Sequence, residues 1–167
     1  EKMGGGIIRG NIGLFTTDLI QPLVSLDGYW KFKTGDHLDW KEPEFDDSEF
    51  ESIQVPAAWE SEGYQDYNGF AWYRKSFGPV PVNRSEEMVL LLGKIDDTDE
   101  VYLNGELIGQ TGSPKNGKEK DSKYDSYHRI VREYHFSSSL LRPENQISVR
   151  VHDSQGNGGI YSGPVGI

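Results

Sequence analysis

Alternating hydrophobic and polar positions recur along this chain and predict strands rather than helices. In "LDGYWKFKTGD" (26–36), Trp30 and Phe32 alternate with Lys31 and Lys33, which is the pattern of a strand with one buried face. The loop-rich segment after it closes with a short strand around 53–55. "GFAWYRKSF" and the continuous apolar run "MVLLLGKI" predict two further strands, the second buried on both faces.

The segment "EVYLNGELIG" predicts a β-hairpin, because two strand-like runs flank Asn104 and Gly105 and this pair favours a tight turn with positive φ. "YHRIVREYHF" (127–136) and "NQISVRVHD" (145–153) predict two more strands, and "SSSLLRPE" between them fits one helical turn. A Gly-rich turn and a last short strand end the chain. The pattern of about nine short strands predicts an all-β sandwich or jelly roll.

Composition restricts the classes of function. A chain of 167 residues fits one domain. Its net charge of -10 argues against a nucleic-acid partner, which needs a basic surface. The absence of cysteine excludes disulfides and thiolate chemistry. No apolar run approaches the roughly 18 residues of a membrane helix, so we expect no membrane insertion of this chain.

Four acidic residues lie close together in "KIDDTDEVYLNG": Asp96, Asp97, Asp99 and Glu100. Glycosidases hold two carboxyl groups about 5–9.5 Å apart across a sugar. Neighbouring residues of a strand point to opposite faces, so these acids do not form such a pair by themselves. We interpret them as the solvated start of a strand, with a metal site as the alternative.

Motifs for catalysis are missing from the sequence. The four histidines form no HExxH motif, and no G-x-S-x-G elbow is present. We therefore predict that the isolated domain is not an enzyme and requires no cofactor.

Aromatic residues are the stronger candidates for ligand binding, because sugars stack their C–H faces on such rings. Trp59, Tyr64 and Tyr67 lie in a loop-rich stretch, where they either pack the loop or form a binding platform. Trp72 lies in a strand pattern, which favours a core position, and we keep it as a ligand candidate. Asp153 is a further oxygen donor.

Several segments, in this order, resemble the N-terminal sugar-binding, jelly-roll domain of glycoside hydrolase family 2, in the galactose-binding-domain-like superfamily. They are "LDGYWKFKTGD", "FDDSEFESIQVPAAWE", "GFAWYRKSF", "LLLGKIDDTDEVYLNGELIGQTG", "NQISVRVHD" and "GNGGIYSGPVGI". The resemblance covers residues 24–167 and leaves residues 1–23 as an N-terminal extension that precedes the sandwich or packs on it.

The resemblance implies roles for individual residues. Arg74, which follows "WY", is expected to form a buried or semi-buried ion pair and is also kept as a candidate ligand-binding residue. Arg132 is a candidate ligand or interface residue. Structural calcium is common in such sandwiches, so Asp96, Asp97 and Asp99 become candidate ligands, although calcium takes six to eight oxygens and the spacing fits no EF-hand. In this family catalysis belongs to a separate barrel of about 250 residues, which a chain of this length does not contain.

Two hypotheses result for the function. The first is a non-catalytic carbohydrate-binding or architectural accessory domain of a larger bacterial protein, exported to the periplasm or beyond, with a glycan or glycoside and an adjacent domain as partners. The second is an extracellular ligand- or partner-binding domain of a bacterial signalling protein. A free-standing hydrolase is the least favoured interpretation.

Overall fold

The computed structural model describes residues 21–83, 85–113 and 124–167. Most of the predicted N-terminal extension, residues 1–20, therefore lies outside the described residues.

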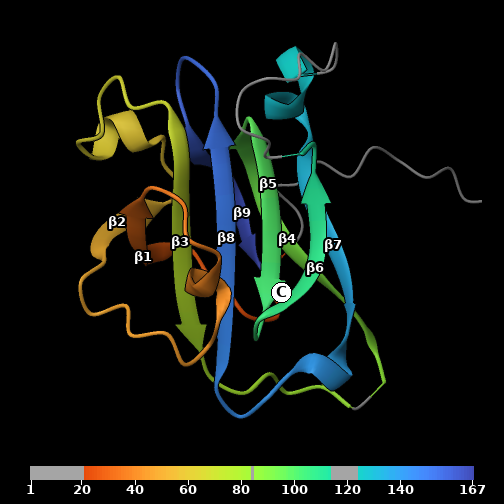
Figure 1. Cartoon of the computed structure of the whole chain (residues 1–167). Helices are drawn as coiled ribbons and strands as arrows, with labels where there is room; N and C mark the ends of the chain where they lie inside the picture. Colours follow the sequence, from red (N-terminus) through yellow and green to blue (C-terminus); the bar gives the residue numbers. More distant parts are fainter. Residues whose placement is uncertain (1–20, 84, 114–123) are drawn as a thin grey trace, which may run out of the picture.

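The described residues form a sandwich of two antiparallel sheets with nine strands in total (Figure 1). The larger sheet has the order β2-β1-β3-β8-β5-β6, and the smaller has the order β7-β4-β9. The strands are β1 (Gly28–Thr34), β2 (Glu51–Val55), β3 (Gly69–Phe77), β4 (Glu87–Asp96), β5 (Thr98–Leu103), β6 (Glu106–Thr111), β7 (Val131–Ser137), β8 (Asn145–Asp153) and β9 (Gly159–Gly166). The predicted all-β sandwich is confirmed.

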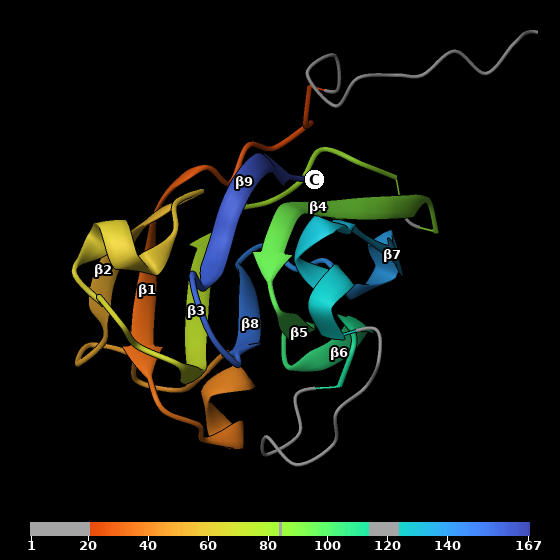
Figure 2. The same ribbon diagram turned by 90° about the horizontal axis from the view of Figure 1, so that it is seen from above.

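The main core lies between the two sheets, because each contributes a face of alternating apolar side chains. Figure 2 shows the smaller sheet lying across the larger one. In β3 the side chains alternate between two faces, and Ala71, Tyr73 and Phe77 belong to the main core. Trp72 and Arg74 point to the other face of the sheet. The buried run in β4 also packs into the core through Leu90, Leu92 and Ile95.

A second, smaller cluster covers the outer face of the larger sheet. Phe50, Trp72 and Tyr102 form it, and Trp40 and Phe45 pack against them. The loop that carries three of these rings includes a short 3₁₀ turn, η2 (Leu38–Lys41). Hydrogen bonds from the Arg74 guanidinium to carbonyls of this loop hold it on the sheet.

The hairpin and the helical turn occur where the sequence predicts them. Asn104 and Gly105 connect β5 to β6 with positive φ angles of 53° and 86°. The turn η5 (Ser138–Leu140) comes directly after β7.

The predicted strand 127–136 is wrong in its first part, because Tyr124–Arg129 form a 3₁₀ turn, η4, and β7 begins only at Val131. The carbonyls of Tyr127 and Ile130 both accept hydrogen bonds from Nη1 of Arg132, at 2.6 Å each. The segment therefore curves around this guanidinium group, and the extended strand begins after it.

Candidate functional site

Carboxylates gather at one end of the sandwich, where β4 passes into β5. Asp96 ends β4, Asp97 precedes β5, and His128 approaches from η4, which lies at the upper end in Figure 1. One side-chain ligand atom from each of these three residues lies within 4.8 Å of the others. Asp97 is buried, whereas Asp96 and His128 are half-buried. Together these three residues form the acidic cluster.

The loop after β8 fixes one carboxylate of the acidic cluster. Oδ2 of Asp97 accepts hydrogen bonds from the backbone N–H of Ser154 at 3.0 Å and from its hydroxyl at 2.7 Å. The backbone N–H of Asp97 donates to the carbonyl of His152. Asp97 is therefore held at both its backbone and its side chain.

Burial and like charges disturb the titration of this end of the molecule. Burial, with the neighbouring Asp97 carboxyl next in weight, raises the pKa of Asp96 to about 8. Burial also raises the pKa of Asp153 to about 7, and the charges of Asp97 and Glu60 add to this shift. A cation or a proton would relieve the crowding of these carboxylates.

A buried ion pair lies directly beneath the acidic cluster. Nε of Arg132 donates to Oδ1 of Asp99 at 2.7 Å, and neither side chain is exposed. Nη2 of Arg132 donates to the carbonyls of Ile95 at 2.9 Å and Asp97 at 2.8 Å. Tyr134 donates its hydroxyl to Oδ2 of Asp99. Burial raises the pKa of Asp99, whereas its hydrogen bonds with Arg132 and Tyr134 act to lower it.

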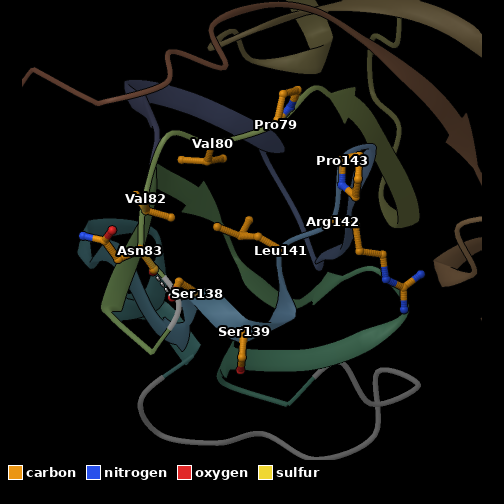
Figure 3. A pocket seen from close by; sticks show the side chains of 9 residues that line it. All are labelled: Pro79, Val80, Val82, Asn83, Ser138, Ser139, Leu141, Arg142 and Pro143. Atoms are coloured by element: carbon orange, nitrogen blue, oxygen red, sulfur yellow. Dashed lines mark hydrogen bonds between the residues drawn. The ribbon is translucent and has the colours of Figure 1, made fainter.

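A pocket of about 350 Å³ lies at the opposite end of the sandwich (Figure 3). The segment between β3 and β4 and the turn after β7 form its walls, and Figure 1 shows both at the lower end of the molecule. Apolar and polar groups share the lining, which consists of Pro79, Val80, Val82, Asn83, Ser138, Ser139, Leu141, Arg142 and Pro143.

The aromatic candidates do not form the exposed binding platform that the sequence left open. Trp59 and Trp72 are both 0% exposed, so neither ring is open to stack on a sugar. The core position favoured for Trp72 is confirmed, and Trp59 packs its loop instead of forming an exposed platform. Trp59 packs near Phe32 and Tyr67, with ring centroids 6.0 and 5.5 Å away. Tyr64 and Tyr67 are only partly buried and pack against the same core.

Trp59 is buried because a loop distant in sequence covers it. A Cβ atom on Gly158 would lie 1.9 Å from Cζ2 of Trp59, so only a glycine lets the backbone approach the ring this closely. The carboxylate of Glu60 accepts the N–H of Gly158 and holds the loop there.

Two predicted arginines have structural roles. Arg74 is 1% exposed and pairs with Asp47, with Nε 2.8 Å from Oδ2, which confirms the expected ion pair. Its guanidinium also donates to the carbonyls of Trp40, Glu42 and Phe45 and so clamps their loop. Arg132 is buried in the pair with Asp99 and does not face a groove.

The three predicted metal ligands separate into two groups. Asp96 and Asp97 lie together, whereas both carboxylate oxygens of Asp99 accept hydrogen bonds from Arg132 and Tyr134. Asp153 is 1% exposed and lies near the acidic cluster instead of on the surface.

Sequence reasoning missed His128 and the pocket around Arg142. The sequence pattern puts His128 in a strand, and no spacing motif links it to the acids 31 and 32 positions earlier. The "PVPV" and "LLRP" segments signal proline-rich turns, but nothing in the sequence shows that they meet.

The comparisons with known proteins favour one family. No family model matches the chain. A β-glucuronidase of Streptococcus agalactiae is 32% identical over 90 residues, which cover 51% of this chain and 14% of that protein. A curated protein of Formosa agariphila that is also named as a β-glucuronidase is 25% identical over 151 residues. This match covers 83% of this chain and 13% of that protein.

The solved structures support the same fold. The Bacteroides uniformis β-glucuronidase superposes with a TM-score of 0.60 at 22% identity, covering 83% of this chain and 17% of that one. The resemblance to the N-terminal domain of glycoside hydrolase family 2 is confirmed, and the galactose-binding-like fold is consistent with it. The chain spans less than a fifth of the length of each of these relatives.

In the described part of the chain, no helix has the length and hydropathy of a membrane span.

Replacing Trp59 with alanine should lower the free energy of unfolding by about 3–5 kcal/mol, because it removes a fully buried ring. Urea unfolding of the purified chain measures this change. Tyr29→Ala is the control, since that ring is 69% exposed and should change stability by no more than about 0.5 kcal/mol. Similar small changes for both variants would show that Trp59 is not a core residue in solution.

Asp99→Ala should cost about 3–5 kcal/mol of stability, because it leaves the buried guanidinium of Arg132 without its counter-charge. The matched control is Glu133→Ala, which removes an exposed acid from the neighbouring strand position. In a double-mutant cycle with Arg132→Met, the double variant should lose less stability than the two single losses added together. Strict additivity would contradict the ion pair.

The raised pKa of Asp96 predicts that stability falls with increasing pH in a chelating buffer. The folded chain keeps a proton between about pH 4, near the unfolded value of 3.8, and the folded value of about 8. The contribution of Asp96 to the free energy of unfolding is therefore complete below this pH window and is lost as the pH rises through it.

Asp96→Asn should remove part of this decline and raise the stability at pH 8 by about 1 kcal/mol, after solvent screening of a half-buried group is allowed for. Chemical unfolding at several pH values measures the slope. Asp46→Asn is the control, because a hydrogen bond from Ser48 lowers the pKa of that exposed acid. An unchanged slope in Asp96→Asn would mean that Asp96 titrates normally.

Proposed function

We propose that this chain is a non-catalytic accessory domain of a larger, exported bacterial carbohydrate-active protein of the glycoside hydrolase family 2 type. Its main role is architectural: it supports and positions a neighbouring domain. The observation that carries the proposal is the coverage of the similarity, which extends over 83% of this chain but only 13% of its β-glucuronidase relative. Export of the parent protein rests on the family resemblance.

The placement of the carboxyl groups supports a non-catalytic role. Asp96 and Asp97 offer oxygens within 4.8 Å of each other, which is closer than the roughly 5–5.5 Å between the two carboxyl groups of a retaining glycosidase. The pocket at the other end of the sandwich has no acid among its lining residues. Neither the acidic cluster nor the pocket therefore presents a general acid and a nucleophile that face each other across a sugar.

The burial of the aromatic side chains supports the architectural role over sugar stacking. Trp30, Trp59 and Trp72 are each 1% exposed or less. Their rings stabilise the sandwich and its outer loop. These large aromatic side chains therefore make the domain rigid instead of forming a sugar-binding surface. A rigid body suits a domain that must hold a neighbour in a fixed position.

Glycan binding in the pocket is a second candidate function, favoured by its lining. Val80 and Leu141 offer apolar surface, while Arg142, Asn83 and Ser139 offer polar groups, which is the mixture that small-molecule sites use. A uronic acid is the sugar class that fits best, because its carboxylate would pair with the guanidinium of Arg142 at the rim of the pocket. This side chain points outward in Figure 3, so binding would require it to turn toward the cavity. The relationship to β-glucuronidases also favours the accessory domain over a signalling domain.

Calorimetric titration of the chain with methyl β-glucuronide and methyl β-galactoside distinguishes the two roles. The architectural role predicts no saturable heat at millimolar concentrations. Pocket binding predicts a saturable glucuronide signal that Arg142→Ala abolishes and Arg129→Ala, an exposed arginine at the opposite end, preserves.

A hydrolysis assay tests the non-catalytic part of the proposal. The chain should release no product from nitrophenyl glycosides above the buffer blank, whereas measurable turnover would overturn the proposal. In the parent protein, deletion of this domain should lower the melting temperature of the neighbouring domain. An unchanged melting temperature would contradict the architectural role.

A further inference from the structure

The acidic cluster has the composition of a cation site and lies outside everything that the proposed function uses. We infer that Asp96, Asp97 and His128 bind a divalent cation of the manganese or zinc class, with Asp153 as an outer carboxylate. This inference rests on side-chain geometry alone and does not depend on the proposed function.

The geometry of the three ligands is the first argument. They come from the end of β4, the β4–β5 connection and η4, so the fold and not a local motif brings them together. Their ligand atoms lie within 4.8 Å of one another. Metal–ligand distances near 2.0–2.2 Å put two ligands of one ion up to about 4.4 Å apart, so small side-chain rotations suffice for coordination.

Asp153 supplies an independent argument. Its side chain is 1% exposed, and its Oδ2 atom has no hydrogen-bond partner among the described residues. A buried carboxylate oxygen without a partner is costly, and buried charges are normally paired or bound to metals. Its other oxygen, Oδ1, accepts the backbone N–H of Gln155 at 2.9 Å.

The strand register directs Asp153 toward the acidic cluster. Thr98 of β5 pairs with His152 of β8 in an antiparallel ladder. Asp97 and Asp153, one position further along the ladder, therefore lie on the same face of the sheet. Asp153 is not among the three residues within 4.8 Å of one another, so it faces the cation as an outer charge that a metal-bound water would reach.

Neighbouring groups orient Asp97, and His128 can become a ligand by exchanging one hydrogen bond. Ser154 occupies Oδ2 of Asp97 and leaves Oδ1, and a fixed outer contact of this kind is typical of metal ligands. Nε2 of His128 accepts a hydrogen bond from Nε of Arg129 at 3.2 Å, so the neutral imidazole carries its proton on Nδ1. A cation bound at Nε2 displaces the Arg129 contact and leaves the Nδ1–H as a donor. The nearby Arg132 is already neutralised by Asp99 and by backbone carbonyls.

The ligand types decide the class of cation. Calcium prefers six to eight oxygen ligands. Carboxylates suit manganese, imidazole suits zinc, and a mixed set of two carboxylates and one imidazole suits either ion better than calcium. This assignment differs from the calcium alternative that the family resemblance implied for Asp96, Asp97 and Asp99, because His128 replaces Asp99 as the third ligand.

Calorimetry and thermal shift on the chelator-stripped chain, with ZnCl₂, MnCl₂ and CaCl₂ as separate probes, test the inference. Zinc or manganese should bind with a stoichiometry of about one and raise the melting temperature, and calcium should bind more weakly. Mn²⁺ should selectively broaden NMR resonances of Asp96, Asp97 and His128.

Variants show whether these residues are the ligands. Asp96→Asn and His128→Gln should each weaken binding by about tenfold or more, and Asp153→Asn by less. Both ligand residues are half-buried, so the variants should fold, and circular dichroism checks this. The matched control is His135→Gln, which removes an exposed histidine 2.9 Å from Glu87 on another part of the surface. It should leave the affinity unchanged.

Three outcomes would overturn the inference. The first is no binding tighter than about 1 mM for zinc or manganese, which would mean that the acids hold a proton instead of a metal ion. The second is an unchanged affinity in His128→Gln, with calcium binding as tightly as zinc. The third is an equal loss in His135→Gln, which would show non-specific binding at surface histidines.

Discussion

The buried guanidinium of Arg132 is the contact on which this end of the molecule depends. It joins β7 to Asp99 of β5 in the other sheet, to the carbonyl of Ile95 in β4, and to the carbonyls of Tyr127 and Ile130. A buried charge is tolerable only when its hydrogen-bonding groups have partners, and here its Nε, Nη1 and Nη2 atoms all donate. The pair therefore fixes how the two sheets meet and where η4 lies.

The acidic cluster is a consequence of that arrangement. Because Arg132 binds the carbonyl of Asp97 and the backbone around His128, it brings the β4–β5 connection and η4 to the same place. The Asp99 carboxylate is used in making this contact, which leaves Asp96 and Asp97 to face His128. One arginine thus separates a structural acid from two acids that remain available for a ligand.

A second arginine stabilises the outer face in a similar way. Arg74 binds Asp47 and three carbonyls of the loop between β1 and β2, so the loop covers Trp72 and Tyr102. Arg150 adds a contact to both oxygens of Asp36, with Nε and Nη2 at 2.8 and 2.6 Å. The outer face is therefore closed, and the two ends of the sandwich offer the sites: the acidic cluster at one and the pocket at the other.

Local sequence was enough to predict the fold class and most of the strands, because the period of two in residues such as Trp30 and Phe32 reflects burial on one face of a sheet. It was also enough for the hairpin, since Asn104 and Gly105 tolerate the positive φ that the turn requires. These are local properties, and they act wherever the segment lies. The ion pair of Arg74 came from the family resemblance. Which residues face solvent and which meet depends instead on tertiary contacts.

Trp59 lies in a loop, yet Gly158, 99 positions later, covers its ring. Asp96, Asp97 and Asp99 look alike in sequence, but Asp99 is the one whose oxygens reach Arg132 and Tyr134. His128 joins the acids only because η4 folds around Arg132. Contacts between segments distant in sequence carry no local pattern, so the candidate site could not be predicted from the periodicity that revealed the fold.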